Sequence, residues 1–196
     1  MAQDIPDYFL SALASFGLPS PQAQRAFWER CALKRYPKNE ILFSEKKRNS
    51  LEYLLLEGVL HRFNENEAGE SVTTGFYLGN AVVTPHFART VQGVSLFSLQ
   101  ALTEVEVAEI PVSELDSLRY SDRAFQMFGI KVIEEAFSKN LLVDIAHRSG
   151  DAKARLDLLR DMYPNIENLA PHHVIASYLG MSPVTLSRIR AQLKSH

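Results

Sequence analysis

The most specific chemical pattern in the chain lies in segment 171–193, PHHVIASYLGMSPVTLSRIRAQL. Ala176 provides the small side chain that two crossing helices need, and Gly180, four residues later, can turn the chain. Ser182 and Pro183 suit the start of a second helix, because a serine hydroxyl caps free backbone amides and proline fits the first turn. The spacing predicts a helix-turn-helix, a unit that places its second helix in the major groove of DNA.

The second helix of this unit would have one locking face and one open face. Leu186, Ile189 and Leu193 fall together at helical spacing and would hold the helix against the first one. On the opposite face, Arg188 can make a bidentate contact with a guanine edge, and Val184 can touch a thymine methyl group. Other side chains suit phosphate oxygens or the DNA backbone, although the two histidines could equally cap a helix or lie on the surface: Thr185, Ser187, Arg190, Lys194, His172 and His173.

Charge is divided unevenly along the chain. The 196 residues carry 21 lysines and arginines against 23 acidic residues, a formal net charge of −2. From Arg148 to His196 there are seven basic and four acidic residues, so this part carries +3 and the rest −5. Glu167 is the last acidic residue. A basic C-terminal part predicts a polyanionic partner, and the helix-turn-helix makes double-stranded DNA the expected one.

Other kinds of chemistry have little support in the sequence. Cys31 is the only cysteine, which excludes an internal disulfide and any cluster held by several cysteines. His61 and His86 stand alone, and no glycine-rich phosphate loop or nucleophile elbow is present. We therefore expect no cofactor and no enzyme activity. Without an apolar run of 18 residues or a signal-like start, we expect a cytoplasmic protein with no membrane partner.

The elements that must position these residues fall into three expected parts. Residues 1–112 combine two short helices with alternating β segments, which is typical of an antiparallel sandwich or barrel. Residues 113–148 are expected to form one long helix, and residues 149–196 hold the helix-turn-helix beyond a hinge at 149–151. The expected strands are 50–56, 59–63, 72–77, 94–102 and 104–110.

The expected long helix has two apolar stripes, whereas a surface helix of a monomer needs only one. One stripe would pack on the β domain and the other on a second copy of the chain, so the pattern predicts a homodimer. The residues assigned to this dimer helix are Phe125, Phe128, Val132, Ile133 and Phe137. The alternative is a helix buried between two domains of one chain.

Taken together, these segments resemble the Crp/Fnr superfamily of bacterial transcription regulators. The resemblance implies an α+β fold with a double-stranded β-helix (jelly roll) of cyclic-nucleotide-binding type, a long dimerisation helix and a C-terminal helix-turn-helix domain. It also implies a homodimeric regulator of transcription, with RNA polymerase as a further partner. The matching segments are 51–60 (LEYLLLEGVL), 100–103 (QALT), 113–115 (SEL), 154–156 (ARL) and 175–193 (IASYLGMSPVTLSRIRAQL).

The chain departs from the superfamily where nucleotide-binding members hold their ligand. Those members carry a Gly-Glu pair for the ribose and an Arg-Ser pair for the cyclic phosphate. This chain has Gly79-Asn80 and Ser95-Leu96 at the corresponding places, and Arg89 could substitute for the missing arginine. The resemblance thus gives a weak effector pocket of Asn80, Arg89 and Ser95. Because the bidentate arginine is missing, we expect no response to cyclic AMP, and a different small-molecule effector or none.

Two other classes of function stay open. In a small-ligand-binding or scaffold protein, the helix-turn-helix would contact a protein instead of DNA, and competition by scrambled duplexes would separate the two. A cupin-like enzyme would need a His-x-His and glutamate cluster, which the sequence does not contain.

Overall fold

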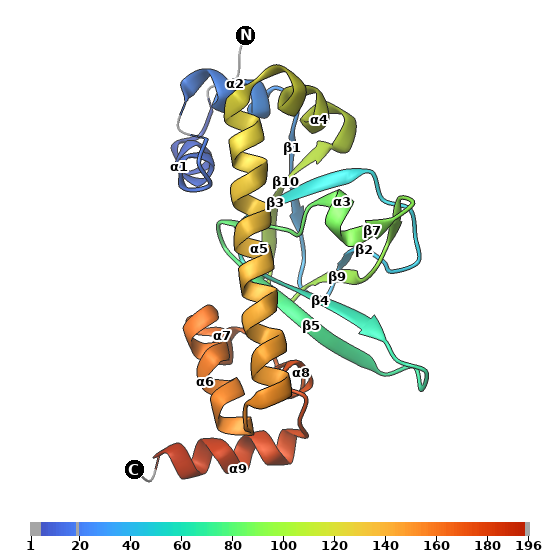
Figure 1. The fold of residues 1–196 in the computed structure, drawn as a ribbon, viewed down its shortest axis with the longest axis vertical. Helices are drawn as coiled ribbons and strands as arrows, with labels where there is room; N and C mark the ends of the chain where they lie inside the picture. The colour runs from blue at the N-terminus through green and yellow to red at the C-terminus, as the bar shows by residue number, and fades with distance from the viewer. Residues whose placement is uncertain (1–4, 19, 195–196) are drawn as a thin grey trace.

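The computed structural model describes residues 5–18 and 20–194, except for the side chain of Lys194. A β-rich body lies along one side of a long helix, and the C-terminal helices gather at the far end of that helix (Figure 1). The helices are α1 (Asp7–Ser15), α2 (Pro21–Trp28), α3 (His86–Arg89), α4 (Val112–Ser121), α5 (Arg123–Ser149), α6 (Ala152–Met162), α7 (Ile166–Leu169), α8 (His172–Tyr178) and α9 (Pro183–Lys194).

The strands form an antiparallel roll of two sheets. They are β1 (Ala32–Tyr36), β2 (Ile41–Phe43), β3 (Leu51–Glu57), β4 (Val59–Glu65), β5 (Ser71–Leu78), β6 (Ala81–Val82), β7 (Thr90–Val91), β8 (Val94–Ser95), β9 (Ser98–Ala101) and β10 (Val105–Pro111). Within the described residues, one sheet has the order β1-β10-β3-β6, the other has the order β2-β9-β4-β5, and β7 pairs with β8. This architecture confirms the predicted α+β class.

The central strand β3 explains why the roll is stable. Tyr53 and Leu55 point into the interior of the roll, whereas Leu54 and Leu56 join a second core beneath the N-terminal helices and α5. Side chains alternate across a strand, so a strand covered on both faces needs apolar residues at consecutive positions. The run LEYLLLE therefore places β3 in the middle of the molecule.

The expected strand 94–102 is broken in the structure. Its first part is β8 and its second part is β9, and the two belong to different sheets. Leu96 is exposed at the break, whereas Phe97 is buried against Phe43, with 5.6 Å between the ring centroids. An apolar run alone does not reveal a chain that passes from one sheet to another.

The prediction of one continuous helix over 113–148 is wrong at its N-terminal end. The chain becomes extended at Asp122, which separates α4 from α5, and the Asp122 carboxylate accepts a hydrogen bond from the Ala124 backbone at 2.8 Å. Aspartate favours such caps because its carboxylate satisfies free amides at a helix start. From there α5 runs uninterrupted to Ser149.

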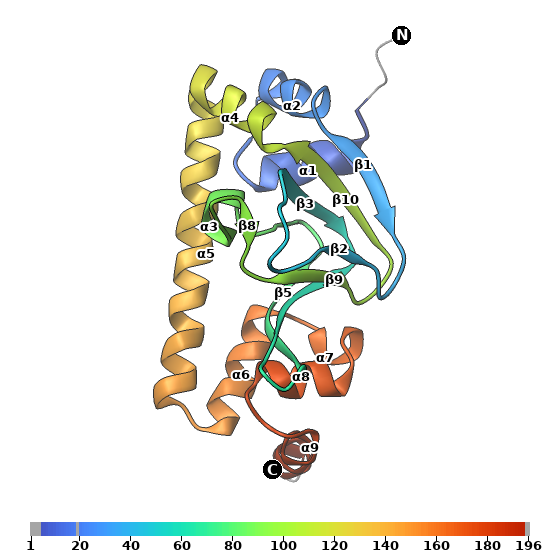
Figure 2. The same cartoon turned by 90° about the vertical axis from the view of Figure 1, so that its right-hand side faces the viewer.

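The two apolar stripes of α5 have different surroundings. Of the residues assigned to the dimer helix, Phe125, Phe128 and Val132 are buried in the core of their own chain, so their stripe is not available for a dimer contact. Ile133 is 40% exposed and Phe137 is 68% exposed. Among the elements of the described residues, none lies over this outer side of α5 (Figure 2). The periodicity revealed two stripes but could not show which one the β domain covers.

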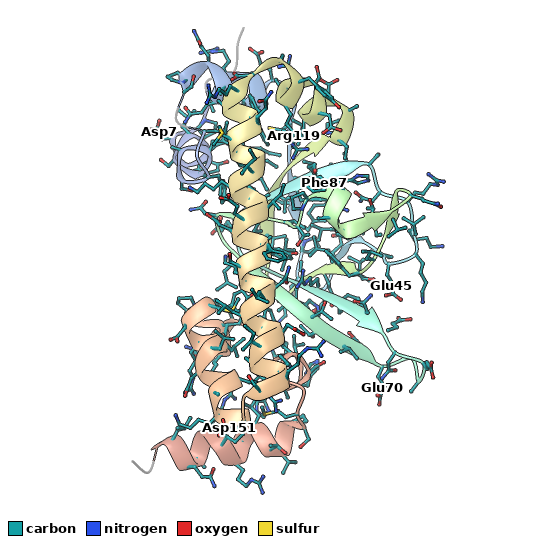
Figure 3. All side chains as sticks on the ribbon, viewed as in Figure 1. Asp7, Glu45, Glu70, Phe87, Arg119 and Asp151 are labelled. Carbon is teal, nitrogen blue, oxygen red and sulfur yellow. The ribbon has the colours of Figure 1, made fainter. Side chains whose placement is uncertain are left out.

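The C-terminal helices pack directly on the roll at β5. Phe76 contacts Tyr163 and Tyr178, with ring centroids 5.5 and 5.1 Å apart. The Thr73 amide donates to Ser177 Oγ of α8 at 3.0 Å. Asp151, labelled in Figure 3 where α5 meets α6, caps α6 by accepting from the Ala154 amide at 2.8 Å. The helix-turn-helix is therefore held at a defined place relative to the roll.

No helix among the described residues has the length and apolar character that crossing a membrane requires.

Candidate nucleic-acid interface

The predicted helix-turn-helix consists of α8, a short turn and α9. Ala176 is fully buried where the helices cross, and the Met181 amide donates to the Ala176 carbonyl at 3.0 Å. Gly180 has φ +64°, a left-handed conformation that side chains with a Cβ rarely adopt. A Cβ there would come no closer than 3.7 Å to His147, so backbone conformation rather than space selects glycine.

Helix α9 starts at Pro183, as predicted. Ser182 Oγ accepts a hydrogen bond from the Thr185 amide at 3.1 Å and also bonds the Thr185 hydroxyl at 2.9 Å. The expected cap is confirmed. The Thr185 hydroxyl, which we predicted to contact phosphate, takes part in this cap.

The two faces of α9 differ as the spacing predicts. Leu186 and Ile189 are buried in the core of the C-terminal helices. Val184 is 78% exposed, and Ser187 and Arg188 are exposed beside it. Within the described part of the chain, the Arg188 guanidinium has no hydrogen-bond or ion-pair partner. Its planar donors are therefore open to a ligand, and base contact by Arg188 stays a prediction.

Arg190 has a different environment from Arg188. Its Nε donates to Glu167 Oε1 at 2.6 Å, and Arg160 Nε donates to Glu167 Oε2, also at 2.6 Å. Burial by itself would raise the pKa of Glu167, but the hydrogen bonds and charges of Arg160 and Arg190 outweigh it and lower that pKa. Arg190 thus ties α9 to its neighbours, and its predicted phosphate contact remains a prediction. Sequence reasoning did not predict this role of Glu167, which it singled out only as the last acidic residue of the chain.

The remaining predicted contacts lie near the ends of the two helices. His173 is exposed at the start of α8, and His172 is half-buried. No side chain among the described residues caps the start of α8, so neither histidine has the capping role that the sequence left open. The Lys194 side chain lies outside the described residues.

Arg89 is buried inside the roll. It is 1% exposed, and its Nη2 donates to Asn49 Oδ1 at 3.2 Å and to the Leu51 carbonyl. The guanidinium lies 4.6 Å from the ring centroid of Phe43 and 4.0 Å from Glu52. Burial lowers the pKa of Arg89, against the opposing effect of Glu52. The side chain thus fills part of the roll interior.

Of the three residues predicted for an effector pocket, Arg89 and Ser95 lie on neighbouring segments, since Thr90 pairs with Ser95 and the Leu96 amide donates to the Arg89 carbonyl at 2.9 Å. Asn80 is exposed and lines a cavity that neither Arg89 nor Ser95 lines. Ser95 is buried, and its hydroxyl has no hydrogen-bond partner among the described residues. The grouping of Asn80, Arg89 and Ser95 therefore needs correction at Asn80. It failed because closure of the roll, rather than sequence distance, decides which side chains share a space.

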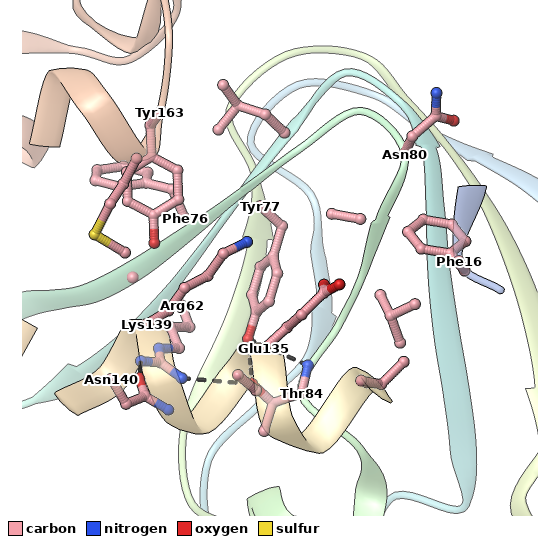
Figure 4. A pocket seen from close by; sticks show the side chains of 17 residues that line it. Phe16, Arg62, Phe76, Tyr77, Asn80, Thr84, Glu135, Lys139, Asn140 and Tyr163 are labelled. Carbon is pink, nitrogen blue, oxygen red and sulfur yellow. Dashed lines mark hydrogen bonds between the residues drawn. The ribbon is translucent and has the colours of Figure 1, made fainter. Parts of the chain in front are cut away.

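A cavity with a volume of about 190 Å³ lies beside the roll, between β5, α5 and α6 (Figure 4). Arg62 Nη2 donates to Asn140 Oδ1 of α5 at 2.8 Å, and the Tyr77 hydroxyl bonds Thr84 Oγ1 at 2.7 Å. Sequence reasoning missed Arg62 because its partner is 78 residues away. The described residues contain no group of three or more His, Cys, Asp or Glu side chains placed to hold a metal ion.

The fold and the open face of α9 define a class of protein, a β-roll joined by a long helix to a helix-turn-helix. No family model and no curated protein matches the sequence. Solved structures do match this fold. FixK2 from Bradyrhizobium japonicum has 18% identity and a TM-score of 0.71, over 84% of this chain and 85% of that chain.

Two more solved structures have the same arrangement. The c-di-GMP-responsive global regulator CLP of Xanthomonas campestris has 19% identity and a TM-score of 0.66, over 87% of this chain and 90% of its own. A structure described as a Crp/Fnr-family transcriptional regulator, from Eubacterium rectale, has 14% identity and a TM-score of 0.70, over 97% of this chain and 88% of that chain. At these identities the likeness shows the fold, which is that of Crp/Fnr-type regulators.

Proposed function

We propose that this chain is a Crp/Fnr-type transcription regulator that binds double-stranded DNA as a homodimer through α9. The observation that carries the proposal is the open face of α9, where Arg188 has no partner among the described residues while Leu186 and Ile189 are buried. Arginine is the side chain best suited to a guanine edge in the major groove. Helix α9 lies at one end of the molecule, away from the roll, so a duplex can approach it (Figures 1 and 2).

The outer face of α5 supports the homodimer. Apolar side chains that are about half exposed follow this face along the helix: Met127, Ile130, Ile133, Phe137, Leu141, Leu142 and Ile145. A contiguous apolar surface of this kind is rare on a monomer. Two copies related by a two-fold axis would cover it and would place two α9 helices on adjacent major grooves, about 34 Å apart.

We assign the three parts of the chain to three roles. Residues 1–112 form the regulatory roll, 113–148 carry the dimer contact and 149–196 contact DNA, with RNA polymerase as a further partner of the regulator. Cyclic AMP is not the effector in this proposal. The Arg89 side chain is only 1% exposed, so burial closes it off from a cyclic phosphate, although its Nε and Nη1 have no hydrogen-bond partner among the described residues. A different small molecule in the cavity beside Arg62 is the alternative effector.

Selection of duplexes from a random pool at physiological salt tests the DNA-binding role. The proposal predicts enrichment of an inverted repeat with half-sites about one helical turn apart. Binding that any duplex or polyanion displaces equally would support the scaffold alternative, in which the helix-turn-helix contacts a protein.

Sedimentation velocity tests the dimer separately. An arginine on the outer face of α5, as in Phe137→Arg, should convert the dimer to a monomer, because a charge would be buried at the centre of an apolar contact. The exposed Tyr120, at the end of α4, provides the matched control, and Tyr120→Arg should leave the dimer intact. A monomeric parent chain would contradict the proposed homodimer.

A further inference from the structure

Glu167 joins three helices of the C-terminal part. It lies on α7, and its carboxylate oxygens accept one hydrogen bond from Arg160 of α6 and one from Arg190 of α9, each at 2.6 Å. All three side chains are between a quarter and two fifths exposed, so water screens the ion pairs only in part. Hydrogen bonds between arginine and carboxylate are among the strongest polar contacts in proteins.

The Glu167 backbone is itself held firmly. The preceding residue, Ile166, is buried in the core of the C-terminal helices. Asn165 before it has φ +64°, which turns the chain into α7, and the Ile166 amide donates to the Tyr163 carbonyl at 3.1 Å. The carboxylate thus projects from a fixed point toward α9.

The apolar contacts of α9 do not fix its rotation as tightly as this ion pair does. Leu186 and Ile189 are buried, but packing of aliphatic side chains is not directional. Arg190 follows Ile189 and lies two residues after Arg188. A directional bond at Arg190 therefore determines how the open face, and Arg188 with it, is turned.

We propose that Glu167 is a positioning residue that sets the orientation of α9 for sequence-specific contact with DNA; this inference rests on the proposed function. The role has a distinctive signature, because Glu167 has two opposite effects on DNA binding. Its charge repels phosphates near the interface, since screening leaves charges within about 10 Å coupled. Its bond to Arg190 orients Arg188, and this orientation affects binding only to the duplex that carries the specific DNA sequence.

Glu167→Gln separates the two effects. The charge of residues 148–196 rises from +3 to +4, so binding to a scrambled duplex should become tighter. Binding to the selected duplex should weaken, so that the ratio of the two affinities falls about tenfold, the size of one charge-assisted hydrogen bond. Glu167→Asp keeps the charge and one of the two bonds, and should recover part of that ratio.

The chain offers a matched control for charge. Asp161 is exposed in α6 and has no ion-pair partner among the described residues. Asp161→Asn changes the charge of the same domain equally without touching α9, so it should tighten binding to both duplexes and leave their ratio unchanged. If Glu167→Gln also leaves the ratio unchanged, the positioning role is wrong.

A readout without DNA keeps this inference separate from the proposed function. Hydrogen exchange of the full chain should show faster exchange in residues 183–194 of Glu167→Gln than in the parent or in Asp161→Asn, with the amides of α5 unaffected. Faster exchange with no sequence preference in the parent would sustain the positioning role and contradict the proposed function. Unchanged exchange in α9 would overturn the positioning role whatever the DNA experiments show.

Discussion

Arg89 and Arg188 are the same side chain in opposite settings. Both were predicted from sequence to contact a ligand. In the structure Arg89 is sealed inside the roll against Phe43 and Asn49, whereas the guanidinium of Arg188 has no partner among the described residues and faces water. The difference teaches that the residue type determines which contacts an arginine can make, whereas its surroundings determine whether a ligand can reach its donors.

The physical reason lies in the cost of burying charge. A buried guanidinium must be compensated by neighbouring dipoles, carboxylates or aromatic faces, and the roll supplies Asn49, Leu51, Glu52 and Phe43. Both hydrogen bonds come from Nη2, and Nε and Nη1 have no partner among the described residues, so burial rather than pairing keeps a ligand from the Arg89 donors. Arg188 stays hydrated, so a guanine edge can replace water without breaking any contact within the chain.

The largest expected effect is on the sealed arginine. Arg89→Ala should lower the free energy of unfolding by about 3 kcal/mol, because Glu52 loses one of its two arginine neighbours and the Phe43 ring loses its contact. Urea unfolding followed by circular dichroism would measure the change. The double variant Arg89→Met/Glu52→Gln, which removes both charges and keeps the volume, should recover most of the loss. A fully stable Arg89→Ala protein would break the comparison.

A smaller effect, and of a different kind, is expected at Arg188. Arg188→Ala should leave the unfolding free energy within about 0.5 kcal/mol of the parent, since the exposed side chain has no hydrogen bond or ion pair to lose among the described residues. Affinity for the selected duplex should fall by about 1–3 kcal/mol and preference at one base pair should relax. Fluorescence anisotropy would measure both, with Arg25→Ala as the control, because Arg25 is exposed on α2 far from α9. Equal losses in the two variants would mean that Arg188 does not contact bases.

A third prediction concerns Ser182, which holds the backbone at the start of the helix that carries Arg188. Ser182→Ala removes the cap of α9 and should cost about 1 kcal/mol of stability, because the Thr185 amide loses its acceptor. Hydrogen exchange at residues 183–187 would locate the loss. Ser182→Asp, which restores an acceptor at the helix start, should reverse it, and failure of the aspartate to do so would show that the cap is not the cause.

The smallest effect is a dependence of stability on pH. Burial lowers the pKa of His61 below 6.5, with His173 adding to this and Gln100 opposing it, and burial followed by Arg155 lowers the pKa of His147. Below pH 6.5 these two histidines therefore bind more protons in the unfolded chain than in the folded one. The stability that the two neutral histidines contribute is complete above that pH, and it is lost as the pH falls through their folded pKa values.

Comparison with variants isolates this pH dependence. The free energy of unfolding should fall between pH 7.5 and 5.5, and the fall should be smaller in His61→Gln. Glu52, whose pKa burial raises, acts in the opposite direction, so the difference between variant and parent is the test. An identical slope in the two proteins would show that His61 titrates alike in the folded and unfolded states.

The C-terminal unit could be predicted because its constraints are local. Ala176, Gly180 and Ser182 occupy fixed offsets within one short segment, and each has its own physical requirement there. The cap at Asp122 was equally local, and the Ser-Asp pair before an apolar run could have revealed the break between α4 and α5.

The roll interior could not be predicted in the same way. Arg62 meets Asn140 across 78 residues, and Arg89 meets Asn49 across 40, so only closure of the sheets brings these partners together. The long helix α5 could be predicted in part. Its periodicity predicted two stripes, but the burial of Phe125 and the exposure of Phe137 depend on which stripe the roll covers.

Protection of guanine N7 atoms from methylation measures most directly whether the open face of α9 contacts base edges in the major groove. The parent protein on its selected duplex should protect one guanine in each of two half-sites about one helical turn apart. Both protections should vanish in Arg188→Ala and persist in Arg25→Ala. A single protected site, or protection that survives the loss of the Arg188 guanidinium, would contradict the account.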